Sequence, residues 1–389
     1  MTSGGEHIID SRTRPQVMGL TSILCLAALG TGSSFAGDDD RPSPYRIRSV
    51  EQLQGMTNNL SAHYVIAEDI DASSTAEWNG GKGFCPVGDG TRPFTGSFDG
   101  QGHSITGLKI NRFGMVTTHI GLFGVVGRDA LIRNVTLRKA YVKGCDYVGA
   151  LVGINQGTVR NCYASGEVYG SGTFGGLVGA NNQGEVTHCS AAVDVGPVWV
   201  GNHLGGLVGC NNKGTIRDSF AAGKVTGQEN PGGLAGVNAG GVIERCYASG
   251  AVSSTFVGSS DDYRRGAGGL VAQHQGGRIS DCFATGPVTG PAGLPVGGLV
   301  GTIDGEASVG NSYCRESRET PLAGVGKVYP GSGLVECESL VKLGAELFAA
   351  SGPLACWDFR KTWAFDESPT ATTCPRFRTL SAEDELRQR

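Results

Sequence analysis

The sequence predicts an all-β protein that folds as a single-stranded parallel β-helix, a solenoid of about seven to nine coils with short helical and aromatic caps. Three observations support this fold class: a glycine-rich segment recurs along the chain, a second block of residues follows most copies, and none of the copies contains a helical period. Glycine supplies 65 of the 389 residues while 39% of the residues are hydrophobic. This mixture predicts short strands separated by turns and argues against a disordered glycine-rich chain.

The glycine-rich segment follows the pattern Gly-[Gly/Ala]-Leu-[Val/Ala]-[Gly/Ala]. Six copies occupy residues 149–153, 175–179, 205–209, 232–236, 268–272 and 297–301, and residues 121–124 form an earlier relative. Successive copies end 26 to 36 residues apart, at positions 124, 153, 179, 209, 236, 272 and 301. A β-propeller is the rival repeat fold, but its blades need about 40–45 residues, so these units are too short for it.

A second block lies about ten residues downstream of five of these copies and ends in an alanine. It begins at Val159, Val186, Ile216, Ile243 and Ile279. One unit cannot bury its apolar face alone, whereas stacked units can. We therefore expect equal positions to form buried columns, one of the motif leucines and one of the alanines: Leu122, Leu151, Leu177, Leu207, Leu234, Leu270 and Leu299; and Ala164, Ala191, Ala221, Ala248 and Ala284.

Asparagine recurs two residues after the glycine motif, as Asn155, Asn181, Asn211 and Asn238. We expect these residues to adopt the left-handed conformation that a corner needs, which asparagine tolerates. Their amides can also hydrogen-bond from coil to coil, as in cross-β ladders. Isolated asparagine turns without a ladder are the alternative.

Four cysteines share one repeat position, where Ser219 stands in the third copy: Cys162, Cys189, Cys246 and Cys282. Cysteine suits a narrow interior, so we expect a column of buried free thiols. The cysteine spacing is unlike that of a zinc site, and no metal site is predicted. Cys356 and Cys374 are the pair that we expect to form a disulfide, because both lie outside the repeats in the C-terminal cap.

The N-terminus has the features of an export signal. Arg12 and Arg14 precede an apolar run at residues 17–29, and small residues at Ser34 and Ala36 offer a cleavage site. The run is shorter than the ~20 residues of a membrane helix; a buried core helix is the alternative. No later segment is apolar enough to cross a membrane, so we expect a secreted or cell-surface protein after cleavage.

The predicted organisation has five parts. These are a signal peptide (1–36), an N-terminal cap (37–63), the β-helix (64–315), a C-terminal cap (316–380) and a disordered tail (381–389). Ser49 and Gln52 match a capping box that starts a short helix ending near Asn58, followed by a strand at residues 64–70. In the C-terminal cap we expect a short helix at residues 340–350 and an apolar plug of four aromatic residues: Trp357, Phe359, Trp363 and Phe365.

The combined pattern G-G-L-V-G-x-N-x-G-x-[VI]-x-x-C-[YF]-A-x-G-x-V resembles the GLUG repeat. That repeat occurs in exported bacterial proteins, including the non-catalytic part of some immunoglobulin A1 peptidases and adhesin-like proteins. Residues 98–108 and the segment from Trp357 to Trp363 resemble flanks of the same proteins, so the resemblance covers roughly residues 64 to 365. It implies the solenoid fold and, because the repeat is a structural unit, only a scaffold role.

Composition and motifs point away from several function classes. The net charge of −4 and the pI near 6.0 provide no basic footprint for nucleic acid. The sequence contains no H-E-x-x-H, G-x-S-x-G or P-loop motif, so no catalytic residue and no cofactor is predicted. Residues 170–175 match G-x-G-x-x-G but precede a strand instead of opening a helix.

One enzymatic alternative stays open, a polysaccharide-acting β-helix enzyme, lyase or hydrolase, that uses acidic residues. The position before the cysteine column holds Asn161, His188, Asp218, Arg245 and Asp281. A solvated ladder of alternating charges explains this column equally well. Asp69 and Asp71 lie on one strand face and could bind calcium; a polar strand edge is the alternative. Asp99 and His103 lie in a glycine-rich turn, where we expect structural roles.

Unit length varies mostly at one corner, between the strand after each alanine and the next glycine motif. The inserts span residues 171–174, 198–204, 228–231, 254–267 and 291–296. Stacking places them on one side of the solenoid, where loops on a rigid scaffold concentrate binding. The ligand-binding candidates are Phe174, Trp199, His203, Phe256, Tyr263, Arg264 and Arg265. Tolerated insertions whose aromatic residues fold against the solenoid are the alternative.

We therefore expect a non-catalytic exported protein, adhesin-like or part of the cell envelope, that binds an extracellular glycan or a surface protein through this loop face. The polysaccharide-acting enzyme and a structural module of a larger surface assembly are the alternatives. A groove with two convergent carboxylates would favour the enzyme. A face of exposed aromatic residues would favour binding.

Overall fold

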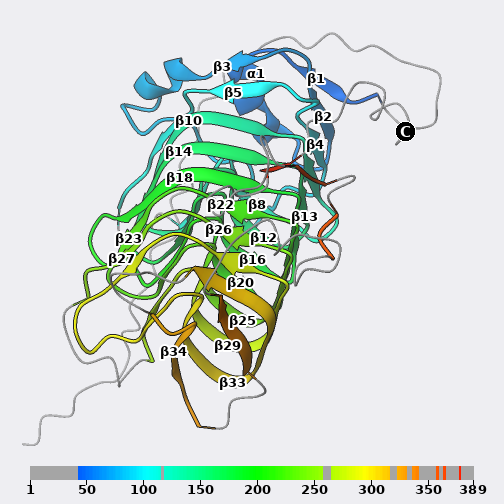
Figure 1. Cartoon of the computed structure of the whole chain (residues 1–389). Helices are drawn as coiled ribbons and strands as arrows, with labels where there is room; N and C mark the ends of the chain where they lie inside the picture. Colours follow the sequence, from blue (N-terminus) through cyan, green and yellow to red (C-terminus); the bar gives the residue numbers. More distant parts are fainter. Residues whose placement is uncertain are drawn as a thin grey trace, which may run out of the picture. The chain divides into compact units, whose positions relative to one another are not determined.

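The computed structural model describes residues 43–114, 118–256, 264–315, 322–330, 335–340, 356–358, 362–364 and 376–377. They belong to one compact unit, Phe35–Arg389. Its strands pair in parallel from coil to coil and form a solenoid (Figure 1), which confirms the predicted fold class. The expected export signal and the tail lie outside the described residues.

Four stacks of parallel strands build the coils. The third coil shows the pattern, with β15 (Thr173–Gly175), β16 (Val178–Asn182), β17 (Glu185–Thr187) and β18 (Ser190–Pro197). The first stack is a seven-stranded sheet and sets the number of complete coils at about seven. Its other strands are β7 (Thr118–Ile120), β11 (Asp146–Gly149), β19 (His203–Gly205), β24 (Pro231–Gly232), β28 (Ala267–Gly268) and β32 (Val296–Gly297).

The other three stacks join into one 28-stranded sheet. The second stack adds β8 (Phe123–Val126), β12 (Val152–Asn155), β20 (Val208–Asn212), β25 (Ala235–Glu244), β29 (Val271–Ser280), β33 (Val300–Arg315) and β34 (Val325–Val328). The third stack adds β1 (Tyr45–Ile47), β2 (His63–Ile66), β4 (Ser97–Asp99), β9 (Leu131–Arg133), β13 (Thr158–Arg160) and β21 (Thr215–Arg217), and continues in β25, β29 and β33.

The fourth stack carries the outer face discussed below. Its strands are β3 (Ile70–Asp71), β5 (Ser104–Thr106), β6 (Lys109–Asn111), β10 (Thr136–Lys143), β14 (Tyr163–Gly170), β18, β22 (Phe220–Ala221), β23 (Val225–Gly227), β26 (Tyr247–Ala248), β27 (Val252–Ser254), β30 (Phe283–Ala284) and β31 (Val288–Thr289). Strand β35 (Val335–Leu340) pairs with β33. Strands β36 (Trp363–Ala364) and β37 (Arg376–Phe377) form a separate antiparallel pair.

The predicted interior columns are confirmed. All seven motif leucines are buried, and the backbone amide of Leu177 donates to the carbonyl of Leu207 at 3.0 Å. The alanines pair in direct register, for example Ala164 with Ala191. Because each coil places the same small or branched side chain above its copy, the interior packs as a continuous core.

The glycines of the motif allow two backbones to touch. A Cβ atom on Gly209 would lie 2.6 Å from the carbonyl oxygen of Gly179 and 2.8 Å from the backbone of Phe174. A Cβ atom on Gly175 would lie 2.3 Å from the carbonyl oxygen of Val178. Neither Gly175 nor Gly209 has a positive φ. Close approach between the first and second stacks, and not turn geometry, therefore explains the motif.

The asparagine ladder is confirmed, but its predicted left-handed conformation is wrong. The Nδ2 of Asn181 donates at 2.8 Å to the Oδ1 of Asn211, and Asn211 donates at 2.8 Å to Asn238. These asparagines are fully buried. Left-handed residues occur instead two positions after the ladder asparagine in three coils, at Gln183, Lys213 and Gly240, with φ between 51° and 68°. A second left-handed column precedes the cysteine position, with φ between 47° and 57°: Asn161, His188, Asp218, Arg245 and Asp281.

His274 continues this interior ladder in the next coil. It pairs in register with Asn238, and its Nδ1 lies 3.2 Å from the Nδ2 of Asn238. Its Nε2 lies 3.1 Å from the carbonyl oxygen of Ser308. Because an amide nitrogen only donates, the Nδ1 must accept and the Nε2 must carry the proton, which is the neutral imidazole. Burial lowers the pKa of His274 accordingly.

The four repeat cysteines are buried free thiols, as predicted. Burial raises the pKa of Cys162 and Cys246 well above the ordinary value, so both remain protonated. The predicted Cys356–Cys374 disulfide is wrong: Cys356 is an exposed free cysteine, and its thiol hydrogen-bonds to Asp281 of the solenoid. Cys374 lies outside the described residues, and Cys85 is disulfide-bonded.

The N-terminal cap contains the predicted helix. Helix α1 (Val50–Gly55) begins after Ser49, whose side chain accepts from the amide of Gln52, and 3-10 helix η1 (Met56–Asn58) follows. The side chains of Leu53 in α1 and Met56 in η1 are fully buried. The single strand expected at residues 64–70 is divided into β2 and β3, and 3-10 helix η2 (Ser73–Glu77) follows. No helix among the described residues has the length and hydropathy of a membrane span.

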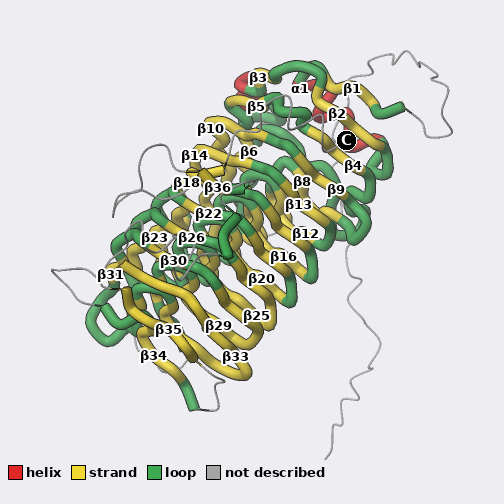
Figure 2. Tube along the Cα trace, turned by 45° about the vertical axis from the view of Figure 1, so that its right-hand side comes forward, coloured by secondary structure: helices red, strands yellow, loops and turns green. Residues whose placement is uncertain are grey.

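The C-terminal aromatic residues pack on the side of the solenoid and not on its end, which corrects the predicted plug. Phe220, Tyr247 and Phe283 stack on successive coils, with ring centroids 4.8 and 4.9 Å apart and interplanar angles of 4° and 5°. Trp363 lies 6.2 Å from Phe220, and Trp357 lies 5.3 Å from Phe283. We call these five residues the covered stack; Figure 2 shows β36 beside β22.

The remaining expectations for the C-terminal cap fall mostly on undescribed residues. Phe359 and Phe365 lie outside the described part of the chain, as does most of the helix expected at residues 340–350. Leu340 itself ends strand β35. The segment that contains Trp357 and Trp363 has no repeat spacing, so its sequence does not indicate which coils it contacts. The position of the two tryptophans was therefore not predicted.

Candidate ligand-binding surface

The strand pairings place the predicted inserts on one side of the solenoid. The fourth-stack strands β14, β18, β23 and β27 lie one above another, as do the first-stack strands β15, β19, β24 and β28. The inserts connect each member of one series to the next member of the other, so they form a single column of loops. We call this column the insert corner (Figure 1).

Two of the predicted ligand-binding aromatics are buried. Phe174 is fully buried, and a Cβ atom on Gly170 would lie 2.7 Å from its ring. Phe174 pairs in register with Val148 and Leu204, so the inward position of that column fixes its direction. Phe256 is also buried, in a small cluster with Val252 and Leu294. Neither ring is accessible to a ligand, which corrects the expectation for these two residues.

His203 lies half-buried on the outer side of the first stack. Its Nδ1 is 3.4 Å from the Oγ1 of Thr173, the residue paired with it in the preceding coil. Burial lowers the pKa of His203, and the charge of Asp146 opposes that shift. A neutral imidazole at physiological pH follows, suited to hydrogen bonding.

The two arginines of the longest insert hold that loop against neighbouring coils. Arg265 forms an ion pair with Glu229 at 2.7 Å and lies over the ring of Phe256 at 4.7 Å. Arg264 forms an ion pair with Asp304 and lies 5.0 Å from the ring centroid of Tyr329. These contacts indicate that both guanidinium groups position the loop. Tyr263 lies outside the described residues.

Trp199 is the candidate that the structure leaves open to solvent. Its side chain is 67% exposed, and its ring meets that of Phe113 edge-on, at 4.8 Å and 83°. Phe113 follows strand β6, whereas Trp199 follows β18, and strands β10 and β14 lie between them in the fourth stack. The contact between the two rings therefore joins residues that follow strands of different coils.

Two tyrosines continue this surface on the strands in between. Tyr141 and Tyr169 have ring centroids 5.8 Å apart, tilted by 49°. The ring of Tyr169 lies beside Gly196 of the next coil, 3.4 Å from where a Cβ atom would stand. Its hydroxyl donates to Glu167 at 3.2 Å, and desolvation together with that carboxylate raises the pKa of Tyr169. We call Phe113, Tyr141, Tyr169 and Trp199 the aromatic strip.

Two lysines lie over rings of the aromatic strip. The Nζ of Lys109 is 6.0 Å from the ring centroid of Tyr141, and the Nζ of Lys143 is 5.2 Å from that of Phe113. Both distances are in the range of cation–π contacts. Neither lysine forms an ion pair with a described residue, so both ammonium groups are free to meet an external anion.

The prediction missed Phe113, Tyr141 and Tyr169 because it sought candidates only in the inserts. The signal for the tyrosines is alternation along the strand. Val142 and Val168 are buried, so the residues on either side of them point outward. Phe113 carries no such signal, since it follows a short strand in a part of the chain before the regular repeats.

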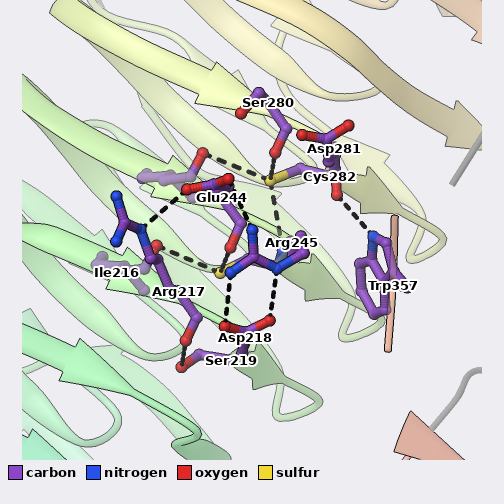
Figure 3. A network of polar contacts seen from close by, with 12 residues as sticks. Ile216, Arg217, Asp218, Ser219, Glu244, Arg245, Ser280, Asp281, Cys282 and Trp357 are labelled. Carbon is purple, nitrogen blue, oxygen red and sulfur yellow. Dashed lines mark hydrogen bonds and ion pairs between the residues drawn. The ribbon is translucent and has the colours of Figure 1, made fainter. Parts of the chain in front are cut away.

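The charged column resolves into interleaved ion pairs (Figure 3). Arg245 donates to both carboxylate oxygens of Asp218, at 2.7 and 2.9 Å, and to Glu244 at 2.7 Å. Arg217 forms an ion pair with Glu244 at 2.9 Å. The hydrogen bond with Asp218 is the main reason that the pKa of Arg245 is raised. This geometry matches the charge-ladder interpretation.

The other members of that column are also engaged. Asp281 accepts a hydrogen bond from Asn311 and lies one coil beyond Arg245, which separates it from Asp218. Burial lowers the pKa of His188, while the charge of Asp218 opposes the shift. Among the described residues, the candidate carboxylates therefore face cations and amides of adjacent coils instead of converging on a groove.

The N-terminal acidic residues hold turns. Asp69 accepts from the amide of Ser104 at 2.7 Å, and Asp71 from the amide of Ser73 at 2.9 Å; these bonds lower the pKa of both carboxyl groups. Asp99 accepts from the amide of Gln101 and from Arg133, both at 2.9 Å. The described residues contain no group of three or more His, Cys, Asp or Glu side chains arranged to hold a metal ion.

The family model of the GLUG motif matches residues 144–169, 200–226, 227–253 and 263–289. Over 154 residues, the chain is 43% identical to halomucin of Haloquadratum walsbyi, a match that covers 38% of this chain and 2% of halomucin. Over 135 residues, it is 38% identical to a candidate Gly-rich membrane protein of Evansella cellulosilytica, covering 33% of this chain and 15% of that protein. The chain thus spans a small part of either curated relative.

Two solved structures share the fold. A candidate immunoglobulin A1 protease from Bacteroides ovatus superposes with a TM-score of 0.55 at 22% identity, over 87% of this chain and 93% of that chain. A structure named IgA1 protease superposes with a TM-score of 0.50 at 17% identity, over 76% of this chain and 21% of that one. The motif matches fall on the stacked coils described above. Four segments of the solenoid are therefore GLUG-motif repeats.

Proposed function

We propose that this chain is an exported, non-catalytic repeat protein of the cell surface, adhesin-like in character, which binds an extracellular glycan through the aromatic strip. The observation that carries this proposal is the exposure of Trp199, 67% of whose side chain faces solvent beside Phe113. A large apolar ring exposed to this degree, in line with three further rings, is typical of an interaction site.

The scaffold supplies the rigidity that such a site needs. Tyr141 and Tyr169 stand on long strands whose intervening valines are buried, so their backbones are fixed by the ladder on both sides. Rings held in place lose little conformational freedom on binding. A sugar offers an apolar face to an aromatic ring and hydroxyl groups to nearby polar side chains, a combination that the tyrosine hydroxyls and lysines suit.

The curated relatives support a location outside the cytoplasm. One is named halomucin, and the other is named a Gly-rich membrane protein. An export signal at residues 1–36, as expected from the sequence, would be consistent with both names. Because the chain spans only 2% and 15% of these relatives, their names support the surface location and not a particular ligand.

A glycan array probed with the full chain tests the proposal. We expect the double variant Trp199→Ala, Tyr169→Ala to lose at least tenfold in affinity for the best glycan, on the order of the 1.4 kcal/mol that two aromatic contacts supply. The matched control is Tyr45→Ala, because Tyr45 is 59% exposed and lies on β1, remote in sequence from the strip.

The controls decide between binding and folding. Both variants should unfold within a few degrees of the parent, since Trp199 and Tyr45 are exposed and Tyr169 is only partly buried. Equal loss of binding in the Tyr45→Ala variant, or full binding by the double variant, would overturn the assignment to the strip. A chain that binds surface proteins but no glycan on the array would overturn the glycan assignment.

A further inference from the structure

The charges around the aromatic strip are distributed unevenly along the solenoid. Lys109 on β6 and Lys143 on β10 lie at the end nearest the N-terminus, on adjacent paired strands. The register pairs Lys109 with Tyr141 and Asn111 with Lys143, so the two lysines are one coil and two residues apart. That offset places their Cα atoms about 8 Å from each other on one outward face.

These two lysines differ from several arginines of other coils, which form ion pairs: Arg133, Arg217, Arg245, Arg264 and Arg265. Neither lysine makes an ion pair with a described residue. The rings of Tyr141 and Phe113 lie beneath the ammonium groups at 6.0 and 5.2 Å. The positive charges are therefore positioned but not neutralised by the protein.

The acidic residues of the same face are already hydrogen-bonded. Glu167 accepts from the hydroxyl of Tyr169, and Asp194 accepts from the backbone amide of Lys224 at 2.9 Å. Glu167 lies on β14 and Asp194 lies on β18, toward the Trp199 end of the strip. A ligand lying along the strip therefore meets free cations at the β6–β10 end and engaged anions at the other.

We propose that the strip selects an acidic polysaccharide, a polyuronate, whose carboxylate groups meet Lys109 and Lys143 while its sugar faces lie on the rings. This inference rests on the proposed function. A lysine ammonium is a compact point charge that suits a single carboxylate. Aromatic rings that already hold the two lysine side chains reduce the ordering that binding requires.

The test measures binding of the full chain to polygalacturonate, to its methyl-esterified form and to dextran sulfate. We expect polygalacturonate to bind about tenfold more tightly than the methyl ester at low salt, and this advantage to shrink at 0.5 M NaCl, where the Debye length falls to about 4 Å. The double variant Lys109→Gln, Lys143→Gln should lose most of that tenfold advantage, because it removes both cations that would meet the carboxylate groups.

Two matched variants complete the design. Lys224→Gln removes an exposed lysine from the same face but away from the rings, and it should leave the preference for polygalacturonate unchanged. Lys109→Arg with Lys143→Arg keeps both charges and should retain it. A melting temperature near that of the parent for each variant would exclude misfolding.

The outcomes separate this inference from the function on which it rests. Equal binding of polygalacturonate and its methyl ester would overturn the preference for acidic chains and leave glycan binding standing. Stronger binding of dextran sulfate than of polygalacturonate would overturn the assignment of carboxylate as the recognised group. Failure to bind any of these probes or any glycan of the array would remove the proposed function itself.

Discussion

The solenoid presents two groups of outward aromatic side chains, the covered stack and the aromatic strip, and they differ in geometry as well as in cover. In the covered stack, Phe220, Tyr247 and Phe283 occupy one repeat position, and their rings are parallel within 5°. In the aromatic strip, the rings come from different positions and are tilted by 49° and 83°. Regular stacking thus accompanies burial, and irregular placement accompanies exposure.

The difference separates a packing role from a binding role. Within the covered stack, Trp357 and Trp363 lie against the rings of the coils and are themselves buried, so these rings contribute to the free energy of folding. Trp199 buries little of its surface against Phe113 and leaves the rest accessible. Two sets of similar residues on the same scaffold can therefore be assigned different tasks from their burial alone, and each assignment has a consequence that can be measured.

The largest expected effect is on the covered side. Trp363→Ala removes a fully buried ring that lies 4.5 Å from Trp357 and 5.9 Å from Tyr247. We expect the free energy of unfolding to fall by about 3–5 kcal/mol in urea denaturation, the range for buried Trp→Ala changes. Trp363→Phe keeps a smaller ring and should lose clearly less.

An unchanged unfolding midpoint for Trp363→Ala would mean that the C-terminal segment does not cover the stack in solution. The comparison between covered and exposed rings would then fail, because Phe220, Tyr247 and Phe283 would themselves be candidates for ligand binding.

The fold was largely predictable from the sequence because residues at the same repeat position contact each other in successive coils. Once Leu177, Leu207 and Leu234 share a repeat position, a parallel solenoid stacks them and no further knowledge of tertiary structure is needed. The asparagine ladder followed from the same step. The backbone conformation of the ladder asparagines did not follow from it. The side chain of Asn181 is buried inside the coil, and the left-handed conformation of that corner is adopted two residues later, by Gln183.

The candidate site was only partly predictable. Repeat spacing located the insert corner, yet it could not distinguish an inward ring such as Phe174 from an outward one such as Trp199 within an irregular loop. The contact between Trp199 and Phe113 joins residues 86 positions apart, one of them outside the regular repeats. Such a contact depends on loop conformation, which alternation and periodicity do not encode.

A smaller effect on stability is expected from the interior ladder, which has a histidine in one coil in place of asparagine. The strip lies on coils whose interior ladder contains Asn155 and Asn181, whereas the coil of Phe283 carries His274 in that ladder. The folded-state pKa of His274 is lowered by burial, so the unfolded chain binds the proton more readily. Stability is therefore complete above pH 6.5, the pKa in the unfolded chain, and decreases below it, by at most about 1.4 kcal/mol per pH unit.

The variant His274→Asn isolates this contribution from that of the other histidines. Asparagine already fills the ladder in four coils, and it does not titrate. Urea denaturation between pH 7 and pH 5 should show a shallower loss for the variant than for the parent. Amide exchange at pH 5 should increase first in β29 and β33 of the parent. Parallel pH profiles for the two proteins would show that His274 does not report on this ladder.

The smallest expected effect belongs to the exposed side and tests the comparison from the opposite direction. Trp199→Ala removes a ring that is 67% exposed and whose one described ring contact is Phe113. We expect the free energy of unfolding to change by no more than about 0.5 kcal/mol, the usual range for surface substitutions. A loss above about 2 kcal/mol would place Trp199 with Trp363 as a packing residue. Trp199 would then be needed for folding, and the glycan proposal would lose its main support.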